Sequence, residues 1–253
     1  MDAKITDRPR PSVGSGDARA RRQQPFDASL VDVPDDSGTL PLGPDDGSGT
    51  LPPEVDEYNP GPETPPRQAA TVILLRGGSD ALEVLLVRRT PHARFMAGVW
   101  VFPGGAVDAD DGDGEVAHRA AAVRELREEA GIALADPAEL VEFSRWITPA
   151  AVRTRFDTHF FLAPLPTGQE PRIDGEECVD LGWFTPQRAL DAHAAKEIVL
   201  VFPTIKHLEQ LLEFSTVEDL LAHARERDVQ PVQPKVFMDG EVARVLLPGE
   251  PGY

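Results

Sequence analysis

The sequence has few of the features that define several common classes of protein. Its single cysteine, Cys178, has no partner for an intrachain disulfide, so nothing indicates an oxidising compartment. No apolar run approaches the roughly 20 residues of a membrane span, and residues 1–9 contain no apolar signal-peptide core. Lys and Arg number 25 against 43 Asp and Glu, and a net charge of −18 disfavours nucleic-acid binding. These absences predict a cytoplasmic protein with no membrane and no nucleic-acid partner.

The composition divides the 253 residues into three parts. Residues 1–66 are rich in Pro, Gly, Ser, Asp and Arg without a regular apolar period, which is typical of a disordered tail. Order should begin near Arg67, and residues 67–200 alternate strand-like and helix-like patterns, as expected of one α/β domain. Residues 201–253 are predicted to form a C-terminal extension of two helices and a hairpin that packs on this domain.

Local signals place the elements of the second half. Thr185 and Pro186 are typical of a helix cap and first helical position. An amphipathic helix is expected over 203–214, and the run 215–218 matches a capping box that would start the next helix at Ser215. A final hairpin is expected about the Asp-Gly pair at 239–240.

In the first half, the expected strands lead to a pair of glycines. Apolar runs at 70–75 and 82–88, separated by a polar turn, predict a hairpin, and a further strand is expected over 98–102. Gly104 and Gly105 follow this strand. Glycine pairs of this kind occur where the chain turns tightly or the backbone approaches another group closely.

The densest part of the sequence follows, where residues 124–132 read RELREEAGI. This composition favours a helix, on which residues three and four positions apart are neighbours. Glu125, Glu128 and Glu129 would then converge, and three adjacent carboxylates repel one another unless a cation lies among them. Mg²⁺ prefers carboxylates, water and phosphates, so the cluster predicts a metal site. The alternative is an ordinary solvated helix face with an Arg124 to Glu128 pair.

The glycine pair followed by RELREEAGI resembles the Nudix box, the signature of hydrolases that act on nucleoside diphosphates linked to another moiety. The resemblance implies an α/β/α sandwich with a mixed sheet. The family usually has about fourteen positions from the second glycine to the arginine, and here Gly105 and Arg124 are nineteen apart. The surplus lies in an Asp-Gly-rich stretch, 108–115. The family also has an acidic position before the helix. Counted back from Arg124, this position falls on Val116, or on Glu115 after a shift of one residue.

The resemblance also implies roles for individual residues. Glu125, Glu128 and Glu129 would hold Mg²⁺ or Mn²⁺, Arg124 would orient them, and Glu128 or a loop glutamate, Glu176 or Glu177, would accept the proton of the attacking water. The residues expected to contact the substrate are Arg89, Gly104, Gly105 and Arg155. A homodimer is a further expectation, because members of the family are often dimers.

Two stretches, residues 155–162 and the LLPGE that begins at Leu246, resemble the subgroup of coenzyme A diphosphatases of the peroxisomal type. The expected partner is therefore a small diphosphate such as coenzyme A, with Trp146 and Phe156 either holding its non-phosphate part or packing in the core. The HxGQV run that many coenzyme A hydrolases carry is absent, so nucleotide-sugars and oxidised nucleoside triphosphates stay open as substrates. A catalytically silent nucleotide-binding module is the alternative from another functional class.

Overall fold

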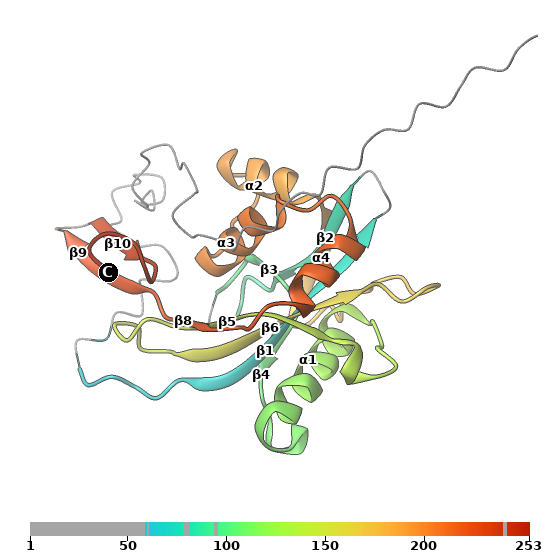
Figure 1. Cartoon of the computed structure of the whole chain (residues 1–253), viewed down its shortest axis with the longest axis horizontal. Helices are drawn as coiled ribbons and strands as arrows, with labels where there is room; N and C mark the ends of the chain where they lie inside the picture. The colour runs from blue at the N-terminus through green and yellow to red at the C-terminus, as the bar shows by residue number, and fades with distance from the viewer. Residues whose placement is uncertain (1–58, 60, 78–80, 94–95, 240–241) are drawn as a thin grey trace, which may run out of the picture. The chain divides into compact units, whose positions relative to one another are not determined.

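The computed structural model describes the chain from residue 59 onward with four short gaps (Figure 1), as residues 59, 61–77, 81–93, 96–239 and 242–253. Most of the tail predicted to be disordered, residues 1–58 and residue 60, lies outside the described residues. Its last part does not: the Asn59 N–H donates to the Ala151 carbonyl at 2.7 Å. No helix in the described ranges is both long enough and apolar enough to cross a bilayer.

A mixed sheet of eight strands forms the centre of the fold. Its order is β3-β2-β1-β6-β5-β8, with β4 paired to β1 and β7 paired to β2. The predicted hairpin is confirmed as the antiparallel β1 and β2, whereas β1 and β6 run parallel. The strands are β1 (Arg67–Gly77), β2 (Leu82–Arg89), β3 (Trp100–Val101), β4 (Gly104–Ala106), β5 (Val141–Ile147), β6 (Phe156–Pro164), β7 (Cys178–Phe184) and β8 (Pro231–Val232).

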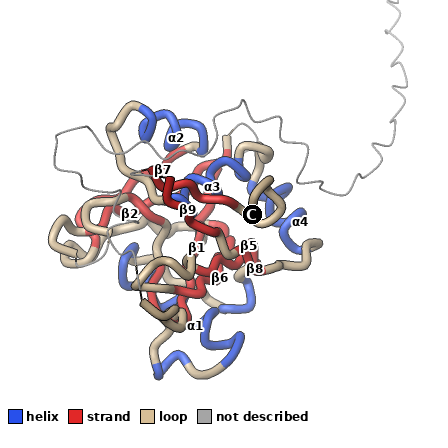
Figure 2. Tube along the Cα trace, turned by 90° about the vertical axis from the view of Figure 1, so that its left-hand side faces the viewer, coloured by secondary structure: helices blue, strands red, loops and turns tan. Residues whose placement is uncertain are grey.

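Helices cover both faces of this sheet, and Figures 1 and 2 show α1 on the opposite side of the strands from α2. They are α1 (Gly114–Ala130), α2 (Pro186–Ala194), α3 (Phe202–Leu211) and α4 (Val217–Arg225), with short 3-10 turns η1 (Ala109–Asp111) and η2 (Pro137–Glu139). Strand β1 explains the layering, because its alternate side chains enter two cores. Val72 and Leu74 pack with α1, while Ile73 and Leu75 pack in the core that includes residues of α2, α3 and α4. The predicted α/β/α sandwich with a mixed sheet is therefore confirmed.

Two of the observed helix caps are the predicted residues, and one differs from the prediction. Thr185 accepts a hydrogen bond from the Arg188 N–H and starts α2, and Gly131 ends α1 in the left-handed conformation with φ 67°. The capping residue of α4 is Thr216, whose side chain accepts from the Asp219 N–H, so the prediction of a cap at Ser215 is wrong by one residue.

The C-terminal hairpin is present as β9 (Lys235–Asp239) and β10 (Val242–Leu246). Asp239 pairs with Val242 in an antiparallel register, which agrees with the predicted hairpin. The turn residues, 240–241, lie outside the described residues.

Candidate active site

A cavity of about 450 Å³ brings together residues from distant parts of the sequence. One end is polar and holds Glu125 and Glu129 of α1, Arg89 at the end of β2, and Glu177 just before β7. A further charged residue of the lining, Arg67 at the start of β1, lies over the Phe156 ring. The glycines of β4 form the adjacent wall. The rest of the lining is predominantly apolar and includes Trp146, Phe156, Phe160 and Phe202. Both candidate aromatics, Trp146 and Phe156, therefore face the cavity.

The two glycines allow helix α1 and strand β4 to approach closely. They lie in a short strand, with Gly104 opposite Thr71 and Gly105 opposite Ala70 on β1, and not in a tight turn. A Cβ at Gly105 would lie 2.3 Å from Glu125 Oε1, and one at Gly104 would lie 2.5 Å from the Ala70 carbonyl oxygen. Any larger residue at position 105 would therefore displace the Glu125 carboxylate from its place beside β4.

Glu129 is the most deeply buried carboxylate of the site, with 2% of its surface exposed. Its Oε2 accepts a hydrogen bond of 2.9 Å from the Gly104 N–H, and its Oε1 lies 3.6 Å from Arg89 Nη1. Burial raises its pKa to about 7, although the Gly104 hydrogen bond and Arg89 act in the opposite direction. Burial and the neighbouring Glu129 charge also raise the pKa of the Cys178 thiol, so this buried cysteine is not activated as a nucleophile.

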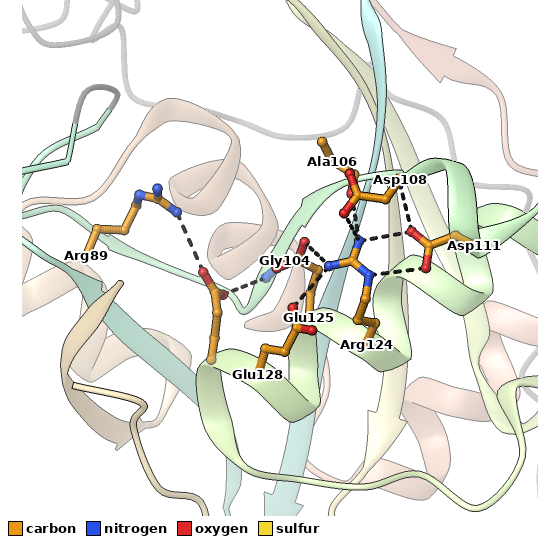
Figure 3. A network of polar contacts seen from close by, with 9 residues as sticks. Arg89, Gly104, Ala106, Asp108, Asp111, Arg124, Glu125 and Glu128 are labelled. Atoms are coloured by element: carbon orange, nitrogen blue, oxygen red, sulfur yellow. Dashed lines mark hydrogen bonds and ion pairs between the residues drawn. The ribbon is translucent and has the colours of Figure 1, made fainter. Parts of the chain in front are cut away.

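Arg124 connects helix α1 to the segment before it (Figure 3). Its Nη1 donates to Glu125 Oε1 at 2.7 Å and to Glu128 Oε2 at 3.1 Å. On the other side, Nε and Nη2 donate to the two carboxylate oxygens of Asp111 at 3.1 and 2.9 Å, and Nη2 also reaches the Ala106 carbonyl at 2.9 Å. The pKa of Arg124 is raised, chiefly by its hydrogen bond to Asp111. The guanidinium thus contacts Glu125 and Glu128, two of the three glutamates that it was predicted to orient.

The sequence did not reveal the part that Asp111 plays. This residue belongs to η1, within the Asp-Gly-rich stretch 108–115, and its side chain is 6% exposed. Val116 is 71% exposed, and Glu115 pairs with Arg119 at 3.6 Å, away from Arg124. The prediction that position 115 or 116 supplies the acid before the helix is wrong. The same family spacing, counted forward from Gly105 instead of back from Arg124, falls on Asp111, so the extra residues follow it.

The structure separates the three helix glutamates. Glu125 and Glu129 line the cavity, whereas the side chain of Glu128 is 59% exposed and contacts Arg124 outside the lining. Within the described ranges, no three His, Cys, Asp or Glu side chains are arranged to hold a metal ion. The positions on the helix explain this, because at about 100° per residue Glu128 and Glu129 point in different directions. The predicted convergence is thus present for the pair and not for all three.

Arg155 does not contribute to the cavity lining. Its side chain is 2% exposed and donates to the carbonyls of Thr148 and Thr64 and to the Glu63 carboxylate. All three partners are internal contacts of the fold, so the prediction that Arg155 binds substrate is wrong. Arg89 and Glu177, in contrast, both face the cavity, and the Glu177 backbone is held by hydrogen bonds to Asp174 and Thr90.

The residues at the polar end fit a hard divalent cation. Burial is the main cause that raises the pKa of Glu125, and the nearby charges of Glu128 and Glu177 raise it further. Three carboxylates, those of Glu125, Glu129 and Glu177, line this end of the cavity with Arg89, while Arg124 also pairs with Asp111 and Glu128 outside the lining. Oxygen donors with excess negative charge are the ligands that Mg²⁺ and Mn²⁺ prefer.

Comparison with known proteins agrees with this geometry. The sequence model of the NUDIX domain matches residues 65–202, more than half of the chain. Human acyl-coenzyme A diphosphatase NUDT19 is 24% identical over 74% of this chain and 80% of its own length, and the protein of the same name from Gallus gallus is 24% identical over 74% and 79%. A Caenorhabditis elegans protein named nudix hydrolase 7 is 30% identical, and this chain spans 60% of its length.

A solved structure supports the same assignment. The crystal structure of a NUDIX hydrolase from Alicyclobacillus acidocaldarius superposes with a TM-score of 0.57 and 28% identity, covering 63% of this chain and 96% of that one. The chain therefore belongs to the Nudix hydrolase family. The predicted resemblance to the coenzyme A diphosphatase-like subgroup is also confirmed, through the relatives that carry the acyl-coenzyme A diphosphatase name.

Proposed function

We propose that this chain is a metal-dependent hydrolase that cleaves the diphosphate linkage of coenzyme A or its acyl derivatives. The observation that carries the proposal is the single cavity with two chemically different ends. Arg89, Glu125, Glu129 and Glu177 gather at one end, while the remainder is largely apolar. A substrate with a charged diphosphate and a less polar arm matches this division. The similarity to acyl-coenzyme A diphosphatases supports the same substrate class.

Each polar residue has a distinct role in this proposal. Arg89 orients the diphosphate: its Nε is buried without a hydrogen-bond partner among the described residues, so the guanidinium retains a donor for phosphate oxygens. Glu125, Glu128 and Glu129 would hold Mg²⁺ or Mn²⁺, with Glu128 moving from its exposed position beside Arg124. When bound, such an ion neutralises charge on the diphosphate oxygens and lowers the pKa of a coordinated water.

The proton of the attacking water goes to a carboxylate, and Glu177 is better placed than Glu128 to accept it. Glu177 faces the cavity from a loop whose backbone is held at Asp174 and Thr90, whereas Glu128 lies outside the lining. Attack at one phosphorus breaks its bond to the bridging oxygen and releases two phosphorylated products. Arg124 and Asp111 take no proton; they hold Glu125 against β4.

A silent nucleotide-binding module is the second candidate, because the exposed Glu128 leaves the set of three carboxylates incomplete. The two candidates differ in one respect that can be measured. An enzyme consumes its ligand when Mg²⁺ is added, whereas a binding module returns it unchanged. The cytoplasmic location and the homodimer stay predictions from the sequence.

The test is a product screen by mass spectrometry, with Mg²⁺ and then Mn²⁺. The substrates are coenzyme A, acyl-coenzyme A esters, NADH, ADP-ribose, nucleotide-sugars and nucleoside triphosphates. We expect cleavage of coenzyme A compounds and a loss of turnover of at least about a hundredfold in Glu129→Gln, comparable to removing one preorganised electrostatic contact. Glu115→Gln is the matched control, because the same change is made on the same helix at a side chain that is 73% exposed.

Two further variants separate the candidate bases. Glu177→Gln should lose at least about a hundredfold in kcat, whereas Glu128→Gln should lose less if it serves the metal alone. If the wild type cleaves none of these compounds but binds Mg²⁺ in calorimetry, its substrate is a compound that the screen did not include. Absence of both cleavage and metal binding would favour the nucleotide-binding module.

A further inference from the structure

The apolar end of the cavity is built largely by segments outside the catalytic motif. Trp146 and Phe156 come from β5 and β6, and Phe202 begins α3. The C-terminal hairpin adds Val236 from β9 and Val245 from β10. These two valines are direct cross-strand partners, so together they present one continuous apolar surface to the cavity.

The hairpin lies beyond the part of the chain that matches the family. That match ends at residue 202, whereas Pro234, Val236 and Val245 all follow it. The family segment therefore supplies the carboxylates and Arg89, and the C-terminal extension supplies part of the apolar wall. Tyr253 contacts the start of this hairpin and the residue before Pro234: its hydroxyl donates to the Gln233 carbonyl at 2.9 Å, and its ring centroid lies 4.1 Å from Lys235 Nζ.

We infer that the β9 and β10 hairpin is the specificity element of this site, and that it binds the aliphatic acyl chain of a coenzyme A thioester. This inference rests on the proposed function and adds to it the part of the chain that selects the acyl group. The selected substrate is the ester of a fatty acid, in preference to free coenzyme A.

The chemistry of the wall favours an aliphatic group over a nucleobase. A base is read by hydrogen-bond donors and acceptors, whereas Val236, Val245 and Phe202 offer apolar side chains. The uncharged polar side chains that β6, α3 and the loop after β5 add to the lining are Thr148, Thr158 and Thr204. The Thr148 hydroxyl accepts a hydrogen bond from the Phe156 N–H at 3.0 Å. An acyl chain needs no such partners and is held by removal of its methylenes from water.

The test measures kcat/KM for free coenzyme A and for its acetyl, butyryl, hexanoyl and octanoyl esters, using the full chain with Mg²⁺. Burial of one methylene corresponds to roughly a fourfold gain in kcat/KM. We expect the wild type to approach this gain for each methylene that the wall covers. Val236→Ser and, independently, Val245→Ser should reduce the gain to less than about twofold per methylene, with little change towards free coenzyme A.

Phe237→Ser provides the matched control. Phe237 follows Val236 on the same strand, does not line the cavity and is 43% exposed, so its replacement should preserve the dependence on chain length. Thermal unfolding of each variant shows whether the hairpin change disturbs the fold. An equal kcat/KM for all esters in the wild type, or an unchanged slope in both valine variants, would overturn the inference.

A binding measurement keeps this inference separate from the proposed function. Calorimetry of Glu129→Gln with coenzyme A and with octanoyl-coenzyme A requires no turnover. Tighter binding of the octanoyl ester, lost in the double variant with Val236→Ser, supports the hairpin as the acyl site even if no substrate is cleaved. Equal affinity for the two compounds would contradict an acyl-binding site at the hairpin, whichever substrate the wild type hydrolyses.

Discussion

Arg124 and Arg155 each bind several acceptors through one guanidinium, but the acceptors differ in kind. Arg124 contacts four carboxylates, those of Asp108, Asp111, Glu125 and Glu128, and its side chain is 26% exposed. Arg155 contacts two backbone carbonyls and one carboxylate, and its side chain is 2% exposed. The first arginine therefore holds one carboxylate that faces the cavity, that of Glu125, while the second joins segments of the fold.

The difference shows what an arginine needs in order to act at a site. Arg124 holds Glu125, whose carboxylate faces the cavity, and it is itself held by Asp111. Arg155 joins the described residues just before β1 to the loop before β6, through Thr64 and Thr148. Replacing each arginine with lysine keeps the charge and removes the planar fork, so the same change tests both roles.

The largest effect is expected for Arg124→Lys. A lysine cannot make the paired contacts to Asp111 while also holding Glu125, so the Glu125 carboxylate loses its orientation. Turnover of the preferred coenzyme A substrate should fall roughly a hundredfold, with a change in unfolding free energy of less than about 1 kcal/mol. Steady-state kinetics and urea unfolding check the two parts. Turnover within threefold of the wild type would remove Arg124 from the site.

Arg155→Lys should show the opposite pattern. Loss of the guanidinium leaves the partly buried carbonyls of Thr148 and Thr64 incompletely paired, which should lower the unfolding free energy by about 2 kcal/mol. The kcat should stay within about threefold of the wild type, because the acidic residues of the site are untouched. Arg153→Lys, at an exposed position on the same loop, is the matched control. A large kcat loss without destabilisation would restore Arg155 to the site.

A smaller effect is expected for Asp111→Asn, which keeps the shape of the side chain but weakens its contact with Arg124. Turnover should fall about tenfold, as for other groups that orient a residue of the site. Asp108→Asn is the matched control, because Asp108 is 66% exposed and lies 3.7 Å from Arg124 Nη2. If both variants lose turnover equally, Arg124 is held by the negative charge of the whole segment before α1, and the hydrogen bonds of Asp111 have no special role.

The smallest effect is a pH dependence of stability. The hydrogen bond from Arg124 holds the pKa of the Asp111 carboxyl below its ordinary value. Its stabilising contribution is therefore complete above the ordinary value and is lost as the pH falls through the lower folded pKa. Urea unfolding at pH 7 and pH 3 should show that the difference in unfolding free energy between the wild type and Asp111→Asn is smaller at pH 3. A difference that grows on acidification would contradict this ion pair.

The sequence predicted part of the site for a local reason. Glu125 and Glu129 are four residues apart on one helix, and such positions share a face whatever surrounds them. Gly105 was singled out for close approach, and the position of the Glu125 carboxylate beside it gives the cause. Glu128 is also close to Glu125 on the helix. Whether the Glu128 side chain faces the cavity depends on how α1 is rotated against β4, and it does not line the cavity.

The remaining residues depend on contacts between distant segments. Asp111 was hidden because the length of a loop does not say where its extra residues lie, and the fold places them between Asp111 and Arg124. Arg155 was misassigned because its partner Glu63 is 92 positions away and no local pattern indicates that contact. In the same way, Val236 of the hairpin joins the cavity wall without any signal in the Nudix motif.

By itself, the sequence determined the family, the α/β/α layering and the glutamates of helix α1, because helical spacing and apolar alternation act over a few neighbouring residues. The tertiary structure alone decided that Asp111 anchors Arg124, that Arg155 is structural and that the C-terminal hairpin lines the cavity. These outcomes depend on which distant segments pack together. Such packing is set by the burial of whole faces, and no local pattern of residues records it.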